Sequence, residues 1–267
     1  MATSYWLPTV NMLPSLVELH LPSCRLTMLP LTLPSINFTS LLVLDLSKNK
    51  FTSTIPPWLF NLTELEMLDL TNNNLTGKLL DSLGYLKSLR YLDLSYNSFQ
   101  GSIPKSIGNL TSLEEFDLAW NQMSGIILES LGEFSSLVSL DIYGNTWEGA
   151  ITEPHFAKLG GLRRSMVSVT FLNHLNLSYN NLSGKIPTGN QFQTFVDPSI
   201  YEGNASLSRC PLPIGCQDNK EAPQIPSGDG GEDDDSKLEK LQFIISMVIG
   251  FCAGFWGVFR TFAMKRF

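Results

Sequence analysis

Apolar and polar positions recur along the chain with a step of 24 residues. The pattern is L-x-x-L-x-L-x-x-N, and its second apolar position falls at Leu44, Leu68, Leu92, Phe116 and Leu140. An earlier copy centres on Leu19 and a later one on Leu175. A fixed period of this length predicts a solenoid of stacked coils, because one such unit is too small to bury its own apolar face. We therefore expect function on a repeated surface, not in a single deep pocket.

Residues 89–104 show the chemistry of one repeat. Leu92 and Leu94 alternate with Tyr91 and Asp93, which is the period-two pattern of a short strand with one buried side. Asn97 follows where the chain must turn, and an inward amide there can bond backbone groups of adjacent coils. The same position holds Asn49, Asn73, Asn121, Asn145 and Asn180, with Cys24 in the first copy.

Several copies end in G-x-I-P, as at residues 101–104 and 184–187. The full pattern, L-x-x-L-x-L-x-x-N-x-L-x-G-x-I-P-x-x-L-x-x-L, resembles the plant-specific class of leucine-rich repeat over residues 13–187. The resemblance implies an α/β-type solenoid of about seven repeats, with a parallel β-sheet on the concave side and a second short sheet beside it. Residues 1–12 form an irregular lead, and the repeats are irregular near residues 150–172.

The composition changes after Pro187, where we expect the repeats to end. Residues 188–216 are rich in turn formers and contain Cys210 and Cys216, which in an oxidising compartment would close a small capping loop. The resemblance places that capping disulfide in doubt, because Ser208 occupies the position of the usual first cysteine. Residues 217–240 are polar and acidic, which favours a disordered, flexible stalk.

Residues 241–259 carry no charge and are just long enough to cross a bilayer as one α-helix. A buried core helix is the alternative interpretation, but no other part of the chain could enclose it. Basic residues in the tail, 260–267, place the C-terminus in the cytoplasm. Small residues that would let another helix approach this span lie at Gly250, Gly254 and Gly257.

Residues 177–204, the acidic stalk and the span at 250–258 together resemble the membrane-proximal end of plant leucine-rich-repeat receptor-like proteins. These are single-span and kinase-less. The resemblance implies a plasma-membrane receptor with its repeats outside, which binds an extracellular elicitor or peptide and signals through an adaptor receptor kinase in defence or development. The chain opens without a signal-peptide pattern, so we expect that expression from Met1 leaves the sequons unmodified.

The interval from Leu140 to Leu175 is 35 residues long instead of 24. Ser165 stands where the next leucine is due. One interpretation is a tolerated loop insertion; another is a seam left by the loss of repeats, which would make the chain a truncated member of its family.

Composition excludes one class of partner. Charged residues make up 16% of the chain and the net charge is −7, so no basic stripe is available for nucleic acid. Sequons for N-glycosylation, some of them spelled by the repeat itself, begin at Asn37, Asn61, Asn74, Asn109, Asn176, Asn181 and Asn204.

The sequence predicts no active site, no cofactor and no metal centre. Its three histidines have no cysteine or carboxylate at metal-ligand spacing, and nucleotide loops and kinase motifs are not found in it. A row of carboxylates follows the strand leucines at Asp45, Asp69, Asp93, Asp117 and Asp141. Such a row could bind cations, but we interpret it as a solvated position of the repeat.

Positions that vary between repeats are better candidates for recognition, because aromatic side chains exposed on a rigid sheet are typical binding anchors. The candidates expected on the concave side are Tyr91, Tyr96, Glu115, Trp120, Tyr143, His174 and Tyr179. The strongest group among them is Tyr96, Trp120 and Tyr143.

Two functional classes stay open. The first is a kinase-less receptor subunit that binds an extracellular peptide, glycan or protein. The second is a non-signalling scaffold or decoy, similar in its use of the surface to leucine-rich-repeat inhibitors of cell-wall enzymes. The predicted membrane span favours the first class.

Overall fold

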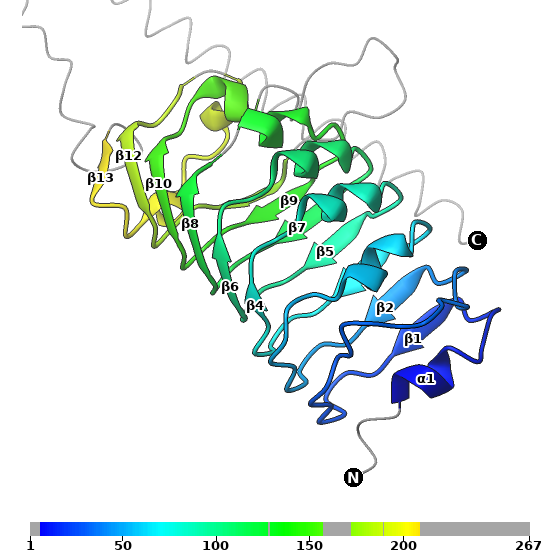
Figure 1. Cartoon of the computed structure of the whole chain (residues 1–267). Helices are drawn as coiled ribbons and strands as arrows, with labels where there is room; N and C mark the ends of the chain where they lie inside the picture. The colour runs from blue at the N-terminus through cyan, green and yellow to red at the C-terminus, as the bar shows by residue number, and fades with distance from the viewer. Residues whose placement is uncertain (1–5, 128, 157–171, 189, 209–267) are drawn as a thin grey trace, which may run out of the picture. The chain divides into compact units, whose positions relative to one another are not determined.

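The computed structural model describes residues 6–127, 129–156, 172–188 and 190–208. All of them belong to the first of two compact units, Met1–Asn219 and Lys220–Phe267. Within this unit the chain forms coils stacked one on the next, from the short helix α1 (Trp6–Val10) to the last strand (Figure 1).

The first sheet has seven parallel strands in the order β1-β2-β3-β5-β7-β9-β11. The strands are β1 (Glu18–His20), β2 (Val43–Asp45), β3 (Met67–Asp69), β5 (Tyr91–Asp93), β7 (Glu115–Asp117), β9 (Ser139–Asp141) and β11 (His174–Asn176). Their central residues pair in one line that runs through Leu19, Leu44, Leu68, Leu92, Phe116, Leu140 and Leu175. The pairing confirms the ladder predicted from the sequence.

A second parallel sheet of six strands runs beside the first in the order β13-β12-β10-β8-β6-β4. Its strands are β4 (Thr76–Gly77), β6 (Ser98–Gly101), β8 (Gln122–Ile126), β10 (Thr146–Ala150), β12 (Asn181–Lys185) and β13 (Ser206–Ser208). This sheet confirms the second feature expected of the plant-specific repeat class.

Single turns of 3-10 helix complete the coils. They are η2 (Pro57–Asn61), η3 (Asp81–Tyr85), η4 (Lys105–Asn109), η5 (Glu129–Glu133), η6 (Glu153–Phe156), η7 (Asn190–Gln193) and η8 (Pro198–Tyr201). The predicted inward residues are buried, including Leu92, Leu94, Phe99 and Ile107. Each such side chain contributes about 1.5–3 kcal/mol, and it does so only because the neighbouring coils cover it.

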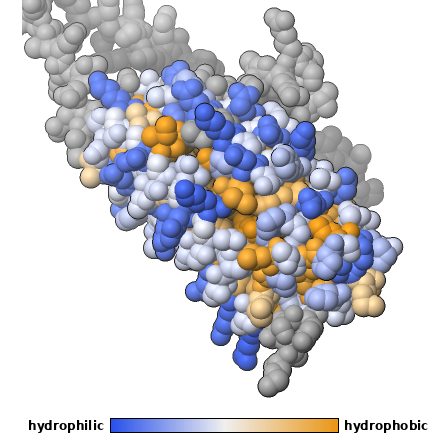
Figure 2. Space-filling view, in the orientation of Figure 1, coloured by the Kyte–Doolittle hydropathy of each residue, from blue (hydrophilic) through white to orange (hydrophobic). Residues whose placement is uncertain are grey.

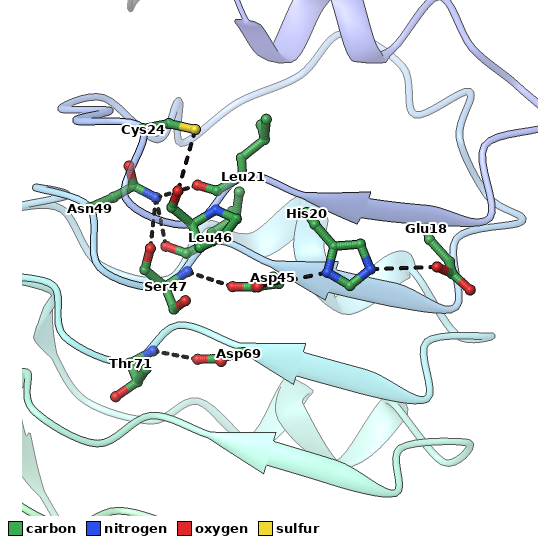
Figure 3. A network of polar contacts seen from close by, with 11 residues as sticks. Glu18, His20, Leu21, Cys24, Asp45, Leu46, Ser47, Asn49, Asp69 and Thr71 are labelled. Carbon is green, nitrogen blue, oxygen red and sulfur yellow. Dashed lines mark hydrogen bonds and ion pairs between the residues drawn. The ribbon is translucent and has the colours of Figure 1, made fainter.

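Asparagine side chains join each coil to the one before it. The Nδ2 of Asn97 donates to the carbonyl oxygens of Leu70 (2.9 Å) and Leu94 (3.1 Å), while its Oδ1 accepts from the N–H of Leu75 (3.0 Å). Figure 3 shows the corresponding contacts of Asn49 with Leu21 and Leu46. The inward orientation predicted for this position is confirmed.

The stack continues past Pro187, where the sequence placed the end of the repeats. Asn204 lies 24 residues after Asn180 and makes the same bonds, from its Nδ2 to Leu177 O (2.9 Å) and from Leu182 N–H to its Oδ1 (3.0 Å). In this final coil η8 replaces a strand of the first sheet, and Tyr201 fills the buried position of the third leucine, which Leu94 holds in its own coil.

Strand β11 pairs directly with β9, although 35 residues separate Leu140 from Leu175. The eleven additional residues therefore leave the first sheet uninterrupted. Residues 157–171, with Ser165, lie outside the described part of the chain.

Among the described residues, no helix is long and apolar enough to cross a membrane. The span expected at residues 241–259, with Gly250, Gly254 and Gly257, lies outside that part of the chain, as do Cys210, Cys216 and the stalk.

Apolar side chains are exposed in the first coil, which has no preceding coil among the described residues. They are Met12, Leu13, Val17, Met28 and Leu31. Figure 2 shows apolar surface, in orange, over this end of the stack.

Candidate ligand-binding surface

The seven residues predicted to face a ligand fall into two rows. Tyr91, Glu115 and His174 are the first residues of strands β5, β7 and β11, and they form a strand row. The other four lie beyond the strand ends, in the turns that lead to the second sheet. This second group, called the aromatic row below, consists of Tyr96, Trp120, Tyr143 and Tyr179.

Rings of the aromatic row contact one another from coil to coil. Tyr96 stacks on Trp120 with centroids 6.0 Å apart and planes 27° apart. Trp120 meets Tyr143 edge to face at 5.2 Å, and Tyr143 meets Tyr179 in the same way at 5.3 Å. The row is open to solvent, since Tyr96, Trp120 and Tyr179 are 54%, 48% and 49% exposed. Four adjoining rings thus form one continuous aromatic surface.

The backbone holds three of these aromatics in the left-handed region. The φ angles of Tyr96, Trp120 and Tyr179 are 52°, 52° and 53°. Neighbouring coils fix the turn, because the N–H of Tyr96 donates to Ala119 O (2.9 Å) and that of Trp120 to Tyr143 O (2.8 Å). This conformation costs a non-glycine residue about 1–2 kcal/mol. Bulky aromatics at such positions are therefore a reason to look for function.

Glycine occupies the same turn position in two other coils, and each of these glycines makes room for an aromatic ring. A Cβ on Gly144 would lie 3.4 Å from Cδ2 of Trp120, and a Cβ on Gly203 would lie 2.8 Å from Cδ1 of Tyr179. Each of these rings therefore lies over the backbone of the following coil.

The predicted row of aspartates has a structural role at the strand ends. Oδ1 of Asp45 accepts the N–H of Ser47, and Oδ1 of Asp69 accepts the N–H of Thr71, both at 2.9 Å (Figure 3). Asp117 caps its own turn in the same way. Each of these carboxylates fixes the start of the turn that leads to the second sheet.

Burial makes two aspartates of this row weaker acids than usual. Desolvation, with the charges of neighbouring aspartates, raises the pKa of Asp69 to about 6 and that of Asp117 to about 7. Within the described residues no group of three histidine, cysteine or acidic side chains is arranged to hold a metal ion.

A polar pocket of about 430 Å³ lies where the first sheet ends, between β11 and residues 195–202. Its lining includes His174 and Asn176 from β11 and Asp197 and Glu202 from the final coil. Nε2 of His174 lies 3.7 Å from Oδ2 of Asp141, which also accepts a hydrogen bond from Asn176 (3.1 Å). One member of the strand row thus reaches a pocket that the sequence did not predict.

The predicted glycosylation sites differ in accessibility. Five asparagines are exposed: Asn37, Asn61, Asn74, Asn109 and Asn181. Asn176 is half-buried, with its Nδ2 bonded to Asp141. Asn204 is 5% exposed and its Nδ2 is the ladder donor described above, so a sugar on that nitrogen is incompatible with this fold.

Sequence reasoning missed the residues of the final coil, including Phe195, Asp197, Ser199 and Glu202. The available signal was Asn204, because it continues the 24-residue step from Asn180.

Comparison with known proteins places these features in a wider context. Residues 37–211 match the family described as leucine-rich repeat region. Receptor-like protein EIX2 of Solanum lycopersicum is 39% identical over 80 residues, which are 28% of this chain and 7% of that protein.

Three solved structures share the fold. The LRR ectodomain of the membrane receptor kinase GASSHO1/SCHENGEN3 from Arabidopsis thaliana, in complex with CASPARIAN STRIP INTEGRITY FACTOR 2, is 33% identical with a TM-score of 0.67; the match covers 77% of this chain and 23% of that one. The Arabidopsis receptor kinase HAESA, in complex with the peptide hormone IDA and the co-receptor SERK1, is 29% identical with a TM-score of 0.58, over 74% and 35%. A plant ice-binding protein is 32% identical with a TM-score of 0.57, over 78% and 70%. The chain therefore spans a small part of the two receptor kinase chains and of the curated relative.

Proposed function

Because the chain belongs to the leucine-rich repeat family, we propose that it acts as the extracellular ligand-binding part of a plant receptor-like protein. The ligand is a peptide or protein that lies across successive coils. The fold alone does not select this function, since an ice-binding protein has a similar one. The proposal rests on the surface that this chain builds on the fold.

The aromatic row is the observation that carries the proposal. Large, half-exposed aromatic side chains on a rigid scaffold are typical anchors of protein recognition, because they supply contact area at a small entropic cost. Here the anchors are Tyr96, Trp120, Tyr143 and Tyr179, and ring contacts hold them in place. Glycine or asparagine would satisfy the left-handed turn of Tyr96, Trp120 and Tyr179 at lower cost, so these three aromatics are better explained by recognition than by folding.

Similar proteins support a peptide as ligand. HAESA is seen with a peptide hormone and a co-receptor, and GASSHO1/SCHENGEN3 with CASPARIAN STRIP INTEGRITY FACTOR 2. By analogy, this chain signals with an adaptor receptor kinase at the plasma membrane. In this proposal residues 241–259 span the membrane with the repeats outside, and Gly250, Gly254 and Gly257 admit the adaptor's helix.

The adaptor part has its own test. The double change Gly250→Leu and Gly254→Leu should reduce co-purification with a co-expressed adaptor kinase without reducing the membrane-bound fraction, because leucine side chains prevent close helix contact. Undiminished co-purification would refute a role for this glycine pair in adaptor contact. The alternative, a non-signalling scaffold or decoy, is favoured if the parent chain binds its ligand but captures no adaptor kinase.

To test ligand binding, peptides are captured from plant extracellular fluid by affinity on the immobilised full-length chain. The captured peptides are then synthesised and their dissociation constants are measured by titration. Trp120→Ala and Tyr143→Ala should each weaken binding by about 1 kcal/mol or more, which is about fivefold. Tyr85→Ala is the matched control, since Tyr85 is 64% exposed on η3 and lies outside the aromatic row. Unchanged affinity in both test variants would place the ligand elsewhere.

A further inference from the structure

The aromatic row ends beside the polar pocket, and the two features share a contact. Tyr179 is the last ring of the row, and its backbone N–H donates to the carbonyl oxygen of Glu202, which lines the pocket, at 2.6 Å. A ligand on the row therefore meets the pocket at its C-terminal end.

The pocket forms because η8 stands where an eighth strand of the first sheet would otherwise lie. Leu177 N–H donates to Ile200 O at 2.9 Å, so the segment keeps its place beside β11. A 3-10 turn does not offer the flat face of a strand, and the space left between them is about 430 Å³. Pockets that hold small ligands start at about 300 Å³, so this volume is enough for one polar side chain or chain terminus with its water.

The ionisable side chains of the lining are two carboxylates and the imidazole of His174. Asp197 and Glu202 contribute two carboxylates, and no lysine or arginine is among the described residues that line the pocket. Hydrogen bonds from the backbone and side chain of Ser199 hold the pKa of Asp197 below its usual range, so this carboxylate is ionised. The Glu202 charge, with its hydrogen bond, raises the pKa of Tyr179, so the tyrosine remains a neutral donor.

Neutral polar groups complete the lining. The amide of Asn176 and the hydroxyls of Ser178 and Ser199 lie around the same space. His174 is held by Asp141, 3.7 Å away, which adds a third carboxylate close to the pocket.

We propose that this pocket binds a cationic group of a peptide, namely a lysine or arginine side chain or a free N-terminal ammonium, while a neighbouring apolar side chain rests on the aromatic row. This inference depends on the proposed peptide-binding function and specifies the chemistry of its ligand. Ammonium and guanidinium groups form strong charge-assisted hydrogen bonds to carboxylates. A peptide that presented its C-terminal carboxylate here would instead face like charges, which oppose binding.

The test uses two substitutions that remove charge and keep shape. Asp197→Asn retains an oxygen for the Ser199 N–H, because asparagine caps as well as aspartate does. Glu202→Gln keeps the backbone carbonyl that accepts the N–H of Tyr179. Glu148→Gln is the matched control, since it removes the same charge from an exposed position on β10. Asp197→Asn and Glu202→Gln are combined in one double variant. Thermal midpoints of the double variant, the control and the parent show whether each is folded.

Random heptapeptides displayed on phage are selected against the immobilised full-length chain, and the enriched peptides are synthesised. We expect enriched sequences to pair lysine or arginine with an adjacent apolar residue. Their affinity should fall about tenfold or more in the double variant, and equally when citrulline or norleucine replaces the basic residue, but not in Glu148→Gln.

Each other outcome is decisive. Enriched peptides without a cation, or undiminished affinity in the folded double variant, would refute the cation pocket. If the enriched peptides bind the double variant normally but lose affinity for Trp120→Ala, the proposed function stands and only this inference falls. Enriched peptides that lack lysine and arginine are synthesised with a free and with an acetylated N-terminus, and equal affinity of the two forms would also overturn the inference.

Discussion

Oδ1 of Asn97 accepts a hydrogen bond from the backbone N–H of Leu75 at 3.0 Å, so one side chain ties two successive coils together. Its Nδ2 satisfies the carbonyl of Leu70 in the earlier coil and that of Leu94 in its own. Every coil after the first has this arrangement, from Asn49 to Asn204, so the stability of the stack depends on a side chain that the sequence identifies by its period.

Asn97→Ala should lower the stability of the full-length chain by about 1–3 kcal/mol, because backbone groups of two coils lose their partner. Thermal and urea unfolding followed by circular dichroism measure the change. Asn74→Ala is the control, since Asn74 is exposed and only its backbone is bonded, to Phe51. Equal midpoints for Asn97→Ala and the parent would contradict the ladder role.

Gly203→Ala should destabilise the final coil for two reasons. The residue has φ +73°, and a Cβ would lie 2.8 Å from the ring of Tyr179. Gly125→Ala separates the two effects, because Gly125 has φ +88° and its Cβ would meet nothing nearer than 3.6 Å. Both variants should lose about 1 kcal/mol from strain. Only Gly203→Ala should lose more and also alter the near-ultraviolet signal of the aromatic row.

Asp117→Asn should stabilise the protein at pH 8 and leave it almost unchanged at pH 4. Burial raises the folded-state pKa of Asp117 to about 7, above its ordinary value of 3.8. The folded chain therefore binds more protons than the unfolded chain between these pH values. Stability accordingly falls as pH rises through this window, and is constant above it.

The expected gain at pH 8 is a rise of about 2–4 °C in thermal midpoint, corresponding to about 1 kcal/mol after solvent screening. Asparagine keeps the cap, as Asn176 of β11 does by accepting the N–H of Ser178. Asp81→Asn, an exposed change on η3, is the control. If Asp117→Asn and the parent have equal thermal midpoints at both pH values, the ionised carboxylate of Asp117 does not destabilise the folded chain.

Secreted protein made behind an added signal peptide should carry no sugar at Asn204. The exposed sequons, such as Asn61 and Asn109, remain open to modification. Enzymatic removal of glycans in heavy-oxygen water, followed by peptide mass spectrometry, marks each occupied asparagine. Detection of modified Asn204 in folded, secreted protein would contradict the buried position of its Nδ2.

Much of the fold could be predicted because leucine and asparagine have the same structural role wherever the 24-residue pattern places them. The line from Leu44 to Leu140 and the inward amides follow directly from periodicity. The final coil escaped detection because Ser199 and Tyr201 stand where leucines are expected, and only Asn204 keeps the pattern.

The candidate site was predictable only in part. Alternation along a strand identifies residues such as Glu115 and His174, whose direction follows from the pleat. The direction of Tyr96 and Trp120 depends instead on a left-handed turn, which no hydrophobic pattern reports. The pocket could not be predicted because it arises where a 3-10 turn replaces a strand, bringing Glu202 to β11.

Strands β9 and β11 are direct neighbours, although the chain between them is longer than one repeat. The ring centroids of Tyr143 and Tyr179 are 5.3 Å apart, although 36 residues separate them in sequence. Those of Tyr96 and Trp120 are 6.0 Å apart with a sequence separation of 24 residues. The eleven residues that lengthen this repeat have therefore left the spacing of the rings from one coil to the next unchanged, so position in the aromatic row is counted in coils and not in residues.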